Sequence, residues 1–292
     1  DARASTLIVD IDCDSRSITV QDDGAGISVD GGLLRVAMCH TTSKIRTVQD
    51  LANLNSLGFR GQGLWAVAMH AGRLVVASRT LGADAGTQIS YKHDGTVAEN
   101  SVCHVAMAAG TIVQALALHG LDFTSAALRE CRNWLVHTAL CYLGTVFVLK
   151  SRGKLVWSSA RWVGMAQSDA FASSLGKNVF EDFRSVTMHD DDVGSVVVVV
   201  GLPSRVHFSS GSRILVSVNG RCVDLPDVTS MVRNMFRMLL PRRRYPAVYV
   251  HLKITKHGAC NWNLHPMKRT MRIGSRSTPC DAAGLVERAC LR

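Results

Sequence analysis

The sequence predicts an α+β protein made of two units, and three observations support this fold class. Runs of alternating apolar and polar residues, typical of strands, begin at Thr6 and recur along the chain. Two longer segments, 127–142 and 227–239, carry apolar residues at helical spacing. The chain has 292 residues, of which 47% are hydrophobic, so it is long enough for two domains with sizeable cores.

The first unit is expected to consist mainly of strands. A turn at 14–16 joins the first two of them. The expected strands are 6–11, 17–21, 74–78, 87–91, 111–116, 145–149 and 154–158. The last two form a hairpin. The helix at 127–142 comes before this hairpin, and its apolar face consists of Leu128, Cys131, Leu135, Thr138, Ala139 and Tyr142.

The second unit is expected to begin near a segment rich in Ser, Ala and Gly at 163–178, which places the domains at 1–170 and 171–292. The run VGSVVVVVGL at 193–202 is long enough for a buried strand. Further strands are expected at 214–218 and 247–254. The helix between them should be capped by Asp227 and stopped by Pro241. Its expected buried face is Val228, Met231, Val232, Met235, Phe236 and Leu239.

Residues 22–27, DDGAGI, have the composition of a nucleotide-binding turn. The Asp22 carboxylate is a strong acceptor that suits the exocyclic amine of adenine. Gly24 and Gly26 permit close approach of the backbone to a ligand and positive φ angles. Taken alone, this pattern is more often an ordinary turn after a strand.

The stretch 37–64, AMCHTTSKIRTVQDLANLNSLGFRGQGL, contains groups that suit a triphosphate. Glycine-rich turns and helix N-termini present backbone N–H groups to anions. Gly58, Gly61 and Gly63 provide such a turn, and the apolar run 64–69 is expected to continue as a helix. The TTSK cluster adds hydroxyl groups and the Lys44 ammonium near the same charge.

The order and spacing of DDGAGI, TTSK and GFRG resemble the nucleotide site of the MutL family of DNA mismatch-repair ATPases, members of the GHKL superfamily. The resemblance extends to VNGRCVD at 218–224, LPRRRYP at 240–246 and NLHPMKR at 263–269. It is strongest at 1–80 and 213–272 and weak at 112–212. It implies a GHKL ATP-binding α/β sandwich followed by a ribosomal-protein-S5-like transducer domain.

Through this resemblance, ATP is the expected ligand of the first domain. The residues expected to bind it are Asp22, Gly24, Gly26, Thr42, Ser43, Lys44, Gly58, Phe59, Arg60, Gly61, Gln62, Gly63, Leu64 and Thr111. In the family, a loop lysine of the second domain also contacts the terminal phosphate. The matching residue is Lys268, and a flexible ammonium suits a phosphate contact of this kind.

The resemblance also implies Mg²⁺, held by an Asn, and a general-base Glu that activates the attacking water. In the family, both lie on a helix that ends in an Asp-Ala pair, and Asp1 and Ala2 resemble that end. We therefore expect the Glu and the Asn upstream of residue 1 and ATP hydrolysis in the parent protein. A water-activating base must lie within hydrogen-bond reach of the nucleophile.

Two departures from the family pattern leave an alternative open. Gln62 and Gly63 replace a Glu-Ala pair, and the segment after Thr111 lacks the family's Leu-Phe pair and Pro-Ala-Arg turn. The chain could instead belong to a hydrolysis-deficient nucleotide-binding scaffold in a MutL-type heterodimer. A topoisomerase-type ATPase subunit is disfavoured by GFRG, and a plain basic DNA-binding domain leaves the Asp22 and glycine pattern unexplained.

The net charge of +10 suggests a polyanionic partner besides ATP. Much of the basic excess lies late in the chain and includes Arg242, Arg243 and Arg244. The resemblance implies contacts to the DNA backbone without sequence preference, made by a nucleotide-driven clamp of two N-terminal regions. It also implies a homodimer or heterodimer partner of MutL type and a MutS-type mismatch-recognition protein.

Cysteine spacing and hydropathy argue against several other classes of protein. The nine cysteines show no C-x-x-C pair and no short-spaced Cys/His cluster, so neither a zinc site nor a disulfide framework is expected, and a reducing compartment is assumed. No run reaches the length of about 18 apolar residues that a membrane span needs. The expected location is the nucleus of a eukaryote or the cytoplasm of a bacterium.

Overall fold

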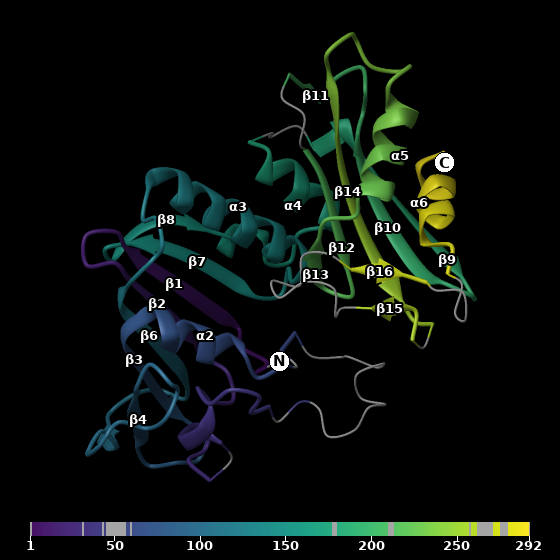
Figure 1. Cartoon of the computed structure of the whole chain (residues 1–292). Coiled ribbons are helices and arrows are strands. Elements are labelled where there is room, and N and C mark those ends of the chain that lie inside the picture. The colour runs from purple at the N-terminus through teal and green to yellow at the C-terminus, as the bar shows by residue number, and fades with distance from the viewer. Residues whose placement is uncertain are drawn as a thin grey trace. The chain divides into compact units, whose positions relative to one another are not determined.

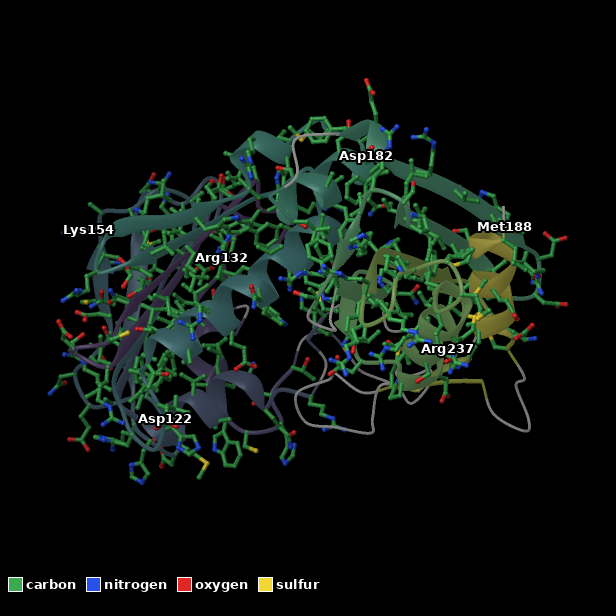
Figure 2. The ribbon with its side chains drawn as sticks, turned by 90° about the horizontal axis from the view of Figure 1, so that it is seen from above. Asp122, Arg132, Lys154, Asp182, Met188 and Arg237 are labelled. Carbon is green, nitrogen blue, oxygen red and sulfur yellow. The ribbon has the colours of Figure 1, made fainter. Side chains whose placement is uncertain are left out.

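The computed structural model of the chain describes residues 2–30, 32–42, 44, 57–58, 60–176, 180–209, 213–256, 258–261, 271–274 and 280–291. Contacts divide the chain into two compact units, one of residues 1–135 and 144–163 and one of residues 136–143 and 164–292. Each unit contains its own sheet (Figure 1). Charged side chains such as Lys154 in the first unit and Arg237 in the second are exposed (Figure 2).

An eight-stranded sheet forms the first unit, in the order β5-β4-β3-β6-β2-β1-β7-β8. Its strands are β1 (Thr6–Asp12), β2 (Ser17–Asp22), β3 (Ala71–Arg79), β4 (Gly86–Tyr91), β5 (Cys103–Val105), β6 (Gly110–Leu118), β7 (Val146–Ser151) and β8 (Lys154–Ser158). The pairing of β1 with β7 is parallel, and the other described pairs of this sheet are antiparallel. All seven strands predicted for this unit are confirmed.

The turn between β1 and β2 forms where the sequence predicts it. The Asp12 carboxylate accepts hydrogen bonds from the backbone N–H groups of Asp14, at 2.9 Å, and Ser15, at 3.3 Å. An Asp side chain commonly stabilises a tight turn by such bonds to its own backbone. Arg16 then adopts a left-handed φ of 52°, and β2 begins at Ser17.

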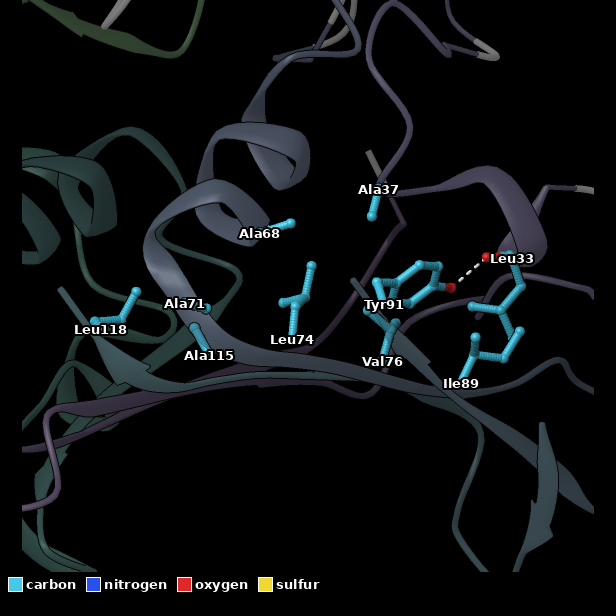
Figure 3. Close-up of a cluster of buried hydrophobic side chains, with 10 residues drawn as sticks. All are labelled: Leu33, Ala37, Ala68, Ala71, Leu74, Val76, Ile89, Tyr91, Ala115 and Leu118. Carbon is cyan, nitrogen blue, oxygen red and sulfur yellow. Dashed lines mark hydrogen bonds between the residues drawn. The ribbon is translucent and has the colours of Figure 1, made fainter. Parts of the chain in front are cut away.

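One face of this sheet is covered by α2 (Gly63–His70) and the short 3-10 helix η1 (Leu33–Arg35). A buried apolar cluster fills the space between them and the sheet (Figure 3). It consists of Leu33, Ala37, Ala68, Ala71, Leu74, Val76, Ile89, Tyr91, Ala115 and Leu118. The Tyr91 hydroxyl donates a hydrogen bond to the Leu33 carbonyl, and burial raises the pKa of Tyr91, so this hydroxyl stays a donor.

The second unit has a six-stranded sheet in the order β13-β12-β14-β10-β9, with β11 paired to β14. Its strands are β9 (Phe183–Asp190), β10 (Gly194–Gly201), β11 (His207–Phe208), β12 (Arg213–Val218), β13 (Arg221–Val223) and β14 (Tyr245–Ile254). The valine-rich run forms β10, as predicted, and β10 lies between β9 and β14. A separate ribbon pairs β15 (Cys260–Asn261) with β16 (Arg272–Ile273).

Four longer helices complete the described structure: α3 (Ser125–Cys141), α4 (Gln167–Ser174), α5 (Pro226–Phe236) and α6 (Ala282–Cys290). Two short 3-10 helices, η2 (Ala160–Trp162) and η3 (Phe180–Asp182), lie next to α4 in the chain. The last turns of α3, from Val136, belong to the second unit. The domain boundary expected between residues 170 and 171 stays a prediction, and that segment lies within α4.

Both predicted ends of the helix α5 are wrong. Leu225 rather than Asp227 occupies the N-cap position, because Pro226 begins the helix at a position where a missing N–H group costs nothing. Asp227 lies in the first turn, where its charge favours the helix dipole. The helix ends at Phe236, well before Pro241, and Leu239 is 65% exposed rather than part of the buried face.

Candidate functional site

A row of three polar residues crosses the sheet of the first unit. Asp22 on β2 is the partner of Thr111 on β6, and Thr111 is the partner of Ser78 on β3. Directly opposed residues of antiparallel strands point to the same face of a sheet. Ser78 and Thr111 are buried and Asp22 is half-buried. The pairing thus brings two predicted site residues, Asp22 and Thr111, together.

Ser78 connects the DDGAGI loop to the start of β6. Its hydroxyl accepts a hydrogen bond from the backbone N–H of Ile27, at 2.7 Å, and donates one to the Gly110 carbonyl, at 3.0 Å. Its oxygen also lies 3.0 Å from the hydroxyl oxygen of Thr111. Sequence reasoning missed Ser78. No local signal marked Ser78, because all residues from 74 to 78 are buried.

The two adjacent carboxylates of the loop have different partners. Asp23 accepts hydrogen bonds from the backbone N–H groups of Ser5, at 2.7 Å, and Thr6, at 2.8 Å, and from the Ser5 hydroxyl. The Ser5 hydroxyl and then the Thr6 N–H lower the pKa of Asp23. Asp22 accepts one bond through Oδ1, from Gly24 N–H at 2.9 Å. Asp23 therefore fixes the start of β1, whereas Asp22 keeps acceptor capacity for a ligand.

Two of the predicted glycines are required by the backbone. Gly26 has φ 72°, and a Cβ atom there would lie 2.2 Å from the Arg79 carbonyl oxygen. Gly61 has φ 60°, and its Cβ would lie 2.3 Å from the Thr41 carbonyl oxygen. The second contact brings the GFRG turn against the TTSK segment, in which Lys44 N–H donates to the Thr42 hydroxyl at 3.1 Å.

Other glycines of the turn leave open space. A Cβ atom at Gly58 or Gly63 would meet nothing within 4 Å. Gly63 begins α2, whose N-cap residue Gln62 makes no side-chain capping hydrogen bond and whose first turn has no acidic residue. The first N–H groups of a helix that lack a cap favour an anion. A phosphate group therefore fits at this end of α2.

A cavity of about 440 Å³ lies on the same face of the sheet as the polar row. Val20 and Val113, which line it, are cross-strand partners two residues from Asp22 and Thr111. Leu64 and Val67 of α2 line it too. Its lining is apolar apart from His70. Apolar walls beside a few convergent polar groups are the usual composition of a small-molecule site.

The remaining predicted site residues fall into three groups. Ser43, Phe59 and Lys268 lie outside the described residues. Arg60 and Gln62 are half-buried in the turn before α2. Arg242, Arg243 and Arg244 are exposed in the second unit, in the turn between α5 and β14. Their role in DNA binding stays a prediction.

No metal site is apparent in the part of the chain that the structure describes. It contains no group of three or more His, Cys, Asp or Glu side chains that could hold an ion. We therefore assign none of these described residues to Mg²⁺. Among the described helices, none is both long enough and apolar enough to cross a bilayer.

Comparison with known proteins finds relatives along almost the whole chain. A family model described as "DNA mismatch repair protein, C-terminal domain" matches residues 171–282. The DNA mismatch repair protein MutL of Nostoc punctiforme is 30% identical, over 92% of this chain and 50% of its own length. MutL of Citrifermentans bemidjiense is 31% identical, over 97% of this chain and 43% of its own. The chain thus spans about half the length of these relatives.

Solved structures share the fold at lower identity. A crystal structure described as the N-terminal domain of a DNA repair protein has a TM-score of 0.74 at 21% identity and covers 94% of this chain and 84% of its own. The Aquifex aeolicus MutL ATPase domain complexed with ADP has a TM-score of 0.58 at 15% identity, with 86% of both chains covered. The 43K ATPase domain of Thermus thermophilus gyrase B has a TM-score of 0.53 at 18% identity, over 92% of this chain and 75% of its own. The predicted fold class is confirmed as an α+β chain with two sheets that shares the fold of solved GHKL-type ATPase domains. The ribosomal-protein-S5-like character of the second domain stays a prediction.

Proposed function

Because this chain belongs to the MutL family of DNA mismatch-repair proteins, we propose that its first unit binds ATP for a nucleotide-driven clamp on DNA. The observation that carries the proposal is the Asp22–Thr111–Ser78 row beside an apolar cavity. A base needs flat apolar walls and a polar edge that reads its hydrogen-bonding groups. Val20 and Val113 offer the walls, and Asp22 offers the edge.

Adenine selection follows from the chemistry of Asp22. A carboxylate can only accept hydrogen bonds when ionised, so it favours the exocyclic amine of adenine and repels the carbonyl oxygen that guanine carries instead. The Asp22 Oδ1 atom is already used by Gly24 N–H. We therefore assign the amine contact to Oδ2. Ser78 and Thr111 hold the strand ends that position this carboxylate.

The phosphates would lie near the N-terminus of α2. The residues that bind them are expected to be Thr42, Ser43 and Lys44, together with the turn from Gly58 to Gly63. Open space beside Gly58 and Gly63 and the uncapped start of α2 support this placement. Lys268 would supply a further cation from the second unit. Bound ATP supplies the phosphoanhydride bond whose hydrolysis resets the clamp.

The clamp follows from differential affinity. A ligand shifts a conformational equilibrium only as far as it binds one state better than the other. Contacts of the phosphates with the GFRG turn and with Lys268 would favour a closed pair of N-terminal regions. Arg242, Arg243 and Arg244 would contact the DNA backbone. The pair is a MutL-type homodimer or heterodimer that acts with a MutS-type protein, in the nucleus of a eukaryote or the cytoplasm of a bacterium.

A hydrolysis-deficient scaffold in a heterodimer is the second candidate, and Gln62 and Gly63 favour it. They stand at the start of α2, where the family has a Glu-Ala pair, and Gly63 lowers the helix propensity there by about 1 kcal/mol relative to Ala. Steady-state hydrolysis by the parent protein separates the candidates. Slow turnover supports the clamp ATPase, and ATP binding without turnover supports the scaffold.

Competition between nucleotides tests the binding site directly. ATP should bind to the 292-residue chain in a calorimetric titration. GTP should compete at least about tenfold more weakly, because the Asp22 carboxylate loses its hydrogen bond to the base and a hydrogen bond to a charged group contributes about 1.5–3 kcal/mol. Equal affinity for ATP and GTP would contradict the role in adenine selection that is assigned to Asp22. Absence of binding of either nucleotide would remove the proposed function.

A further inference from the structure

The second unit contains a cluster of reactive side chains that nucleotide binding does not use. Cys141 stands at the end of α3, Ser217 on β12, Cys222 on β13, and Tyr249 and His251 on β14. All five belong to the same compact unit. Ser217 and Tyr249 are fully buried, and the two cysteines are half-buried. Buried polar groups of this kind need hydrogen-bond partners.

A continuous hydrogen-bond network joins one of these cysteines to the sheet. The Ser217 hydroxyl oxygen lies 2.8 Å from His251 Nδ1 and 3.0 Å from the Tyr249 hydroxyl oxygen. The Tyr249 hydroxyl lies 3.6 Å from the Cys141 sulfur. Burial raises the pKa of Tyr249, so its hydroxyl stays protonated and can donate to that sulfur.

The second cysteine, Cys222, belongs to the same cluster. Cys222 on β13 is the cross-strand partner of Ser217 on β12, so the two side chains are neighbours on one face of the sheet. The Cys222 sulfur lies 3.6 Å from the Thr138 hydroxyl oxygen. Thr138 precedes Cys141 by one helical turn, on the same side of α3. The Cys222 sulfur therefore lies beside the turn of α3 that ends at Cys141.

These contacts give Cys141 an environment that differs from that of the other buried cysteines. Hydrogen bonds from Cys222 and then from His251, Tyr249 and Ser217 lower the pKa of Cys141, against the opposing effect of burial. Burial raises the pKa of Cys260 to about 12 and that of Cys290 to about 11. The thiolate is the nucleophilic form of cysteine, so reactivity concentrates at Cys141.

We propose that Cys141 and Cys222 are a peroxide-reactive thiol pair, a modification site at which oxidation joins α3 to β13 by a disulfide. None of the nine cysteines of the chain forms a disulfide in the structure. The two thiols come from elements far apart in sequence, and the contact of Cys222 with Thr138, one helical turn before Cys141, brings these elements together. Cys141 is the attacking residue and Cys222 is the resolving residue.

The reaction balances with hydrogen peroxide as the oxidant. The Cys141 sulfur attacks one peroxide oxygen, the O–O bond breaks, and the other oxygen leaves as water after taking up a proton, which gives a sulfenic acid at Cys141. The Cys222 sulfur then attacks the Cys141 sulfur. The S–O bond breaks, a second water leaves with the Cys222 proton, and the S–S bond forms. Two thiols are oxidised and one peroxide is reduced to two waters.

Peptide mapping of the full chain tests the pair. The reduced protein is treated with hydrogen peroxide, its remaining thiols are alkylated, and it is digested without reduction for mass spectrometry. We expect a linked peptide that contains Cys141 and Cys222 and disappears on reduction. Cys131→Ser, on the same helix, is the matched control and should leave this peptide unchanged.

The order of the two steps has its own test. In Cys222→Ser the disulfide cannot form, so a sulfenic acid should persist at Cys141 and react with dimedone. Oxidation of the exposed Cys103 without any Cys141–Cys222 peptide in the wild-type chain would overturn the proposal. Dimedone labelling of other cysteines in the variant while Cys141 stays unlabelled would also overturn the proposal. The wild-type measurement decides the matter even if a variant fails to fold.

Discussion

Asp22 and Asp23 are adjacent in sequence, but their partners in the first unit separate their roles. Asp23 accepts backbone and hydroxyl hydrogen bonds from Ser5 and Thr6, which order the start of β1. Asp22 lies in a row with Thr111 and Ser78. Sequence reasoning predicted a role for Asp22 from its motif. It could not identify Ser78, because the register between β3 and β6 is set by the tertiary fold and leaves no local pattern.

The lowered pKa of Asp23 predicts a loss of stability in acid. A carboxylate whose pKa is lower in the folded state stabilises the protein fully above its unfolded value near 3.8, and this contribution disappears as the pH falls through the folded-state pKa. Asp23→Asn should therefore flatten the dependence of unfolding free energy on pH below about pH 4. Urea unfolding at a series of pH values measures it. An unchanged pH dependence would contradict the assigned bonds.

Ser78→Ala should reduce both stability and nucleotide affinity. The change leaves the Ile27 N–H without its acceptor, at a cost of about 1–3 kcal/mol, and releases the DDGAGI loop from β6. Ser90→Ala is the matched control. It is a buried serine of β4 that accepts hydrogen bonds from Arg73 instead. The control should lose stability but keep its affinity for ATP, as denaturation and titration of both variants can establish.

Among the elements, most of the longer strands and helices were predictable from sequence, whereas β9, α4, α6 and the shortest strands were not. β5, β11 and β13 have two or three residues each, too few for a period to appear. α4 was missed because its sequence is rich in small and polar residues, although it buries Phe171. The ends of α5 were misplaced because Pro226 and the local turn outweighed the expected cap. The glycine motifs, in contrast, need particular backbone angles and were therefore recognisable.

Two glycines of the GFRG turn should respond oppositely to the same substitution. Gly61→Ala places a Cβ against the Thr41 carbonyl at a positive φ and should destabilise the chain by about 1–3 kcal/mol. Gly63→Ala meets no protein atom and should stabilise α2 by up to about 1 kcal/mol. Thermal unfolding of both variants measures the difference. Equal effects would show that the contact between the GFRG and TTSK segments is absent in solution.

For the whole molecule, the net charge of +10 and the exposed turn at 242–244 predict electrostatic contacts with the phosphates of DNA. Neutralised phosphates release counterions, so affinity for DNA should fall steeply as salt increases. The chain represents about half of the length of its curated relatives. Mismatch repair therefore remains a property to be tested in the whole protein, whereas contacts with the DNA backbone can be tested with this chain.

Arg242→Ala, Arg243→Ala and Arg244→Ala should each weaken binding to duplexes of unrelated sequence by a similar factor. Each lost phosphate contact should lower the slope of log affinity against log salt by about 1. Arg152→Ala is the control, since Arg152 is an exposed arginine of the first unit that pairs with Asp14 at 2.6 Å. Fluorescence anisotropy at several salt concentrations gives the slopes. A slope that changes equally in the control would place DNA elsewhere on the surface.

The most direct test of the nucleotide site is calorimetric titration of ATP into the wild-type chain and into Asp22→Asn and Asp23→Asn. We expect Asp22→Asn to lower the affinity at least about tenfold, because a charged hydrogen bond to the base is lost. We expect Asp23→Asn, which alters only the start of β1, to bind ATP nearly as the wild type does. Equal affinities for the wild type and Asp22→Asn would contradict the assignment of the site.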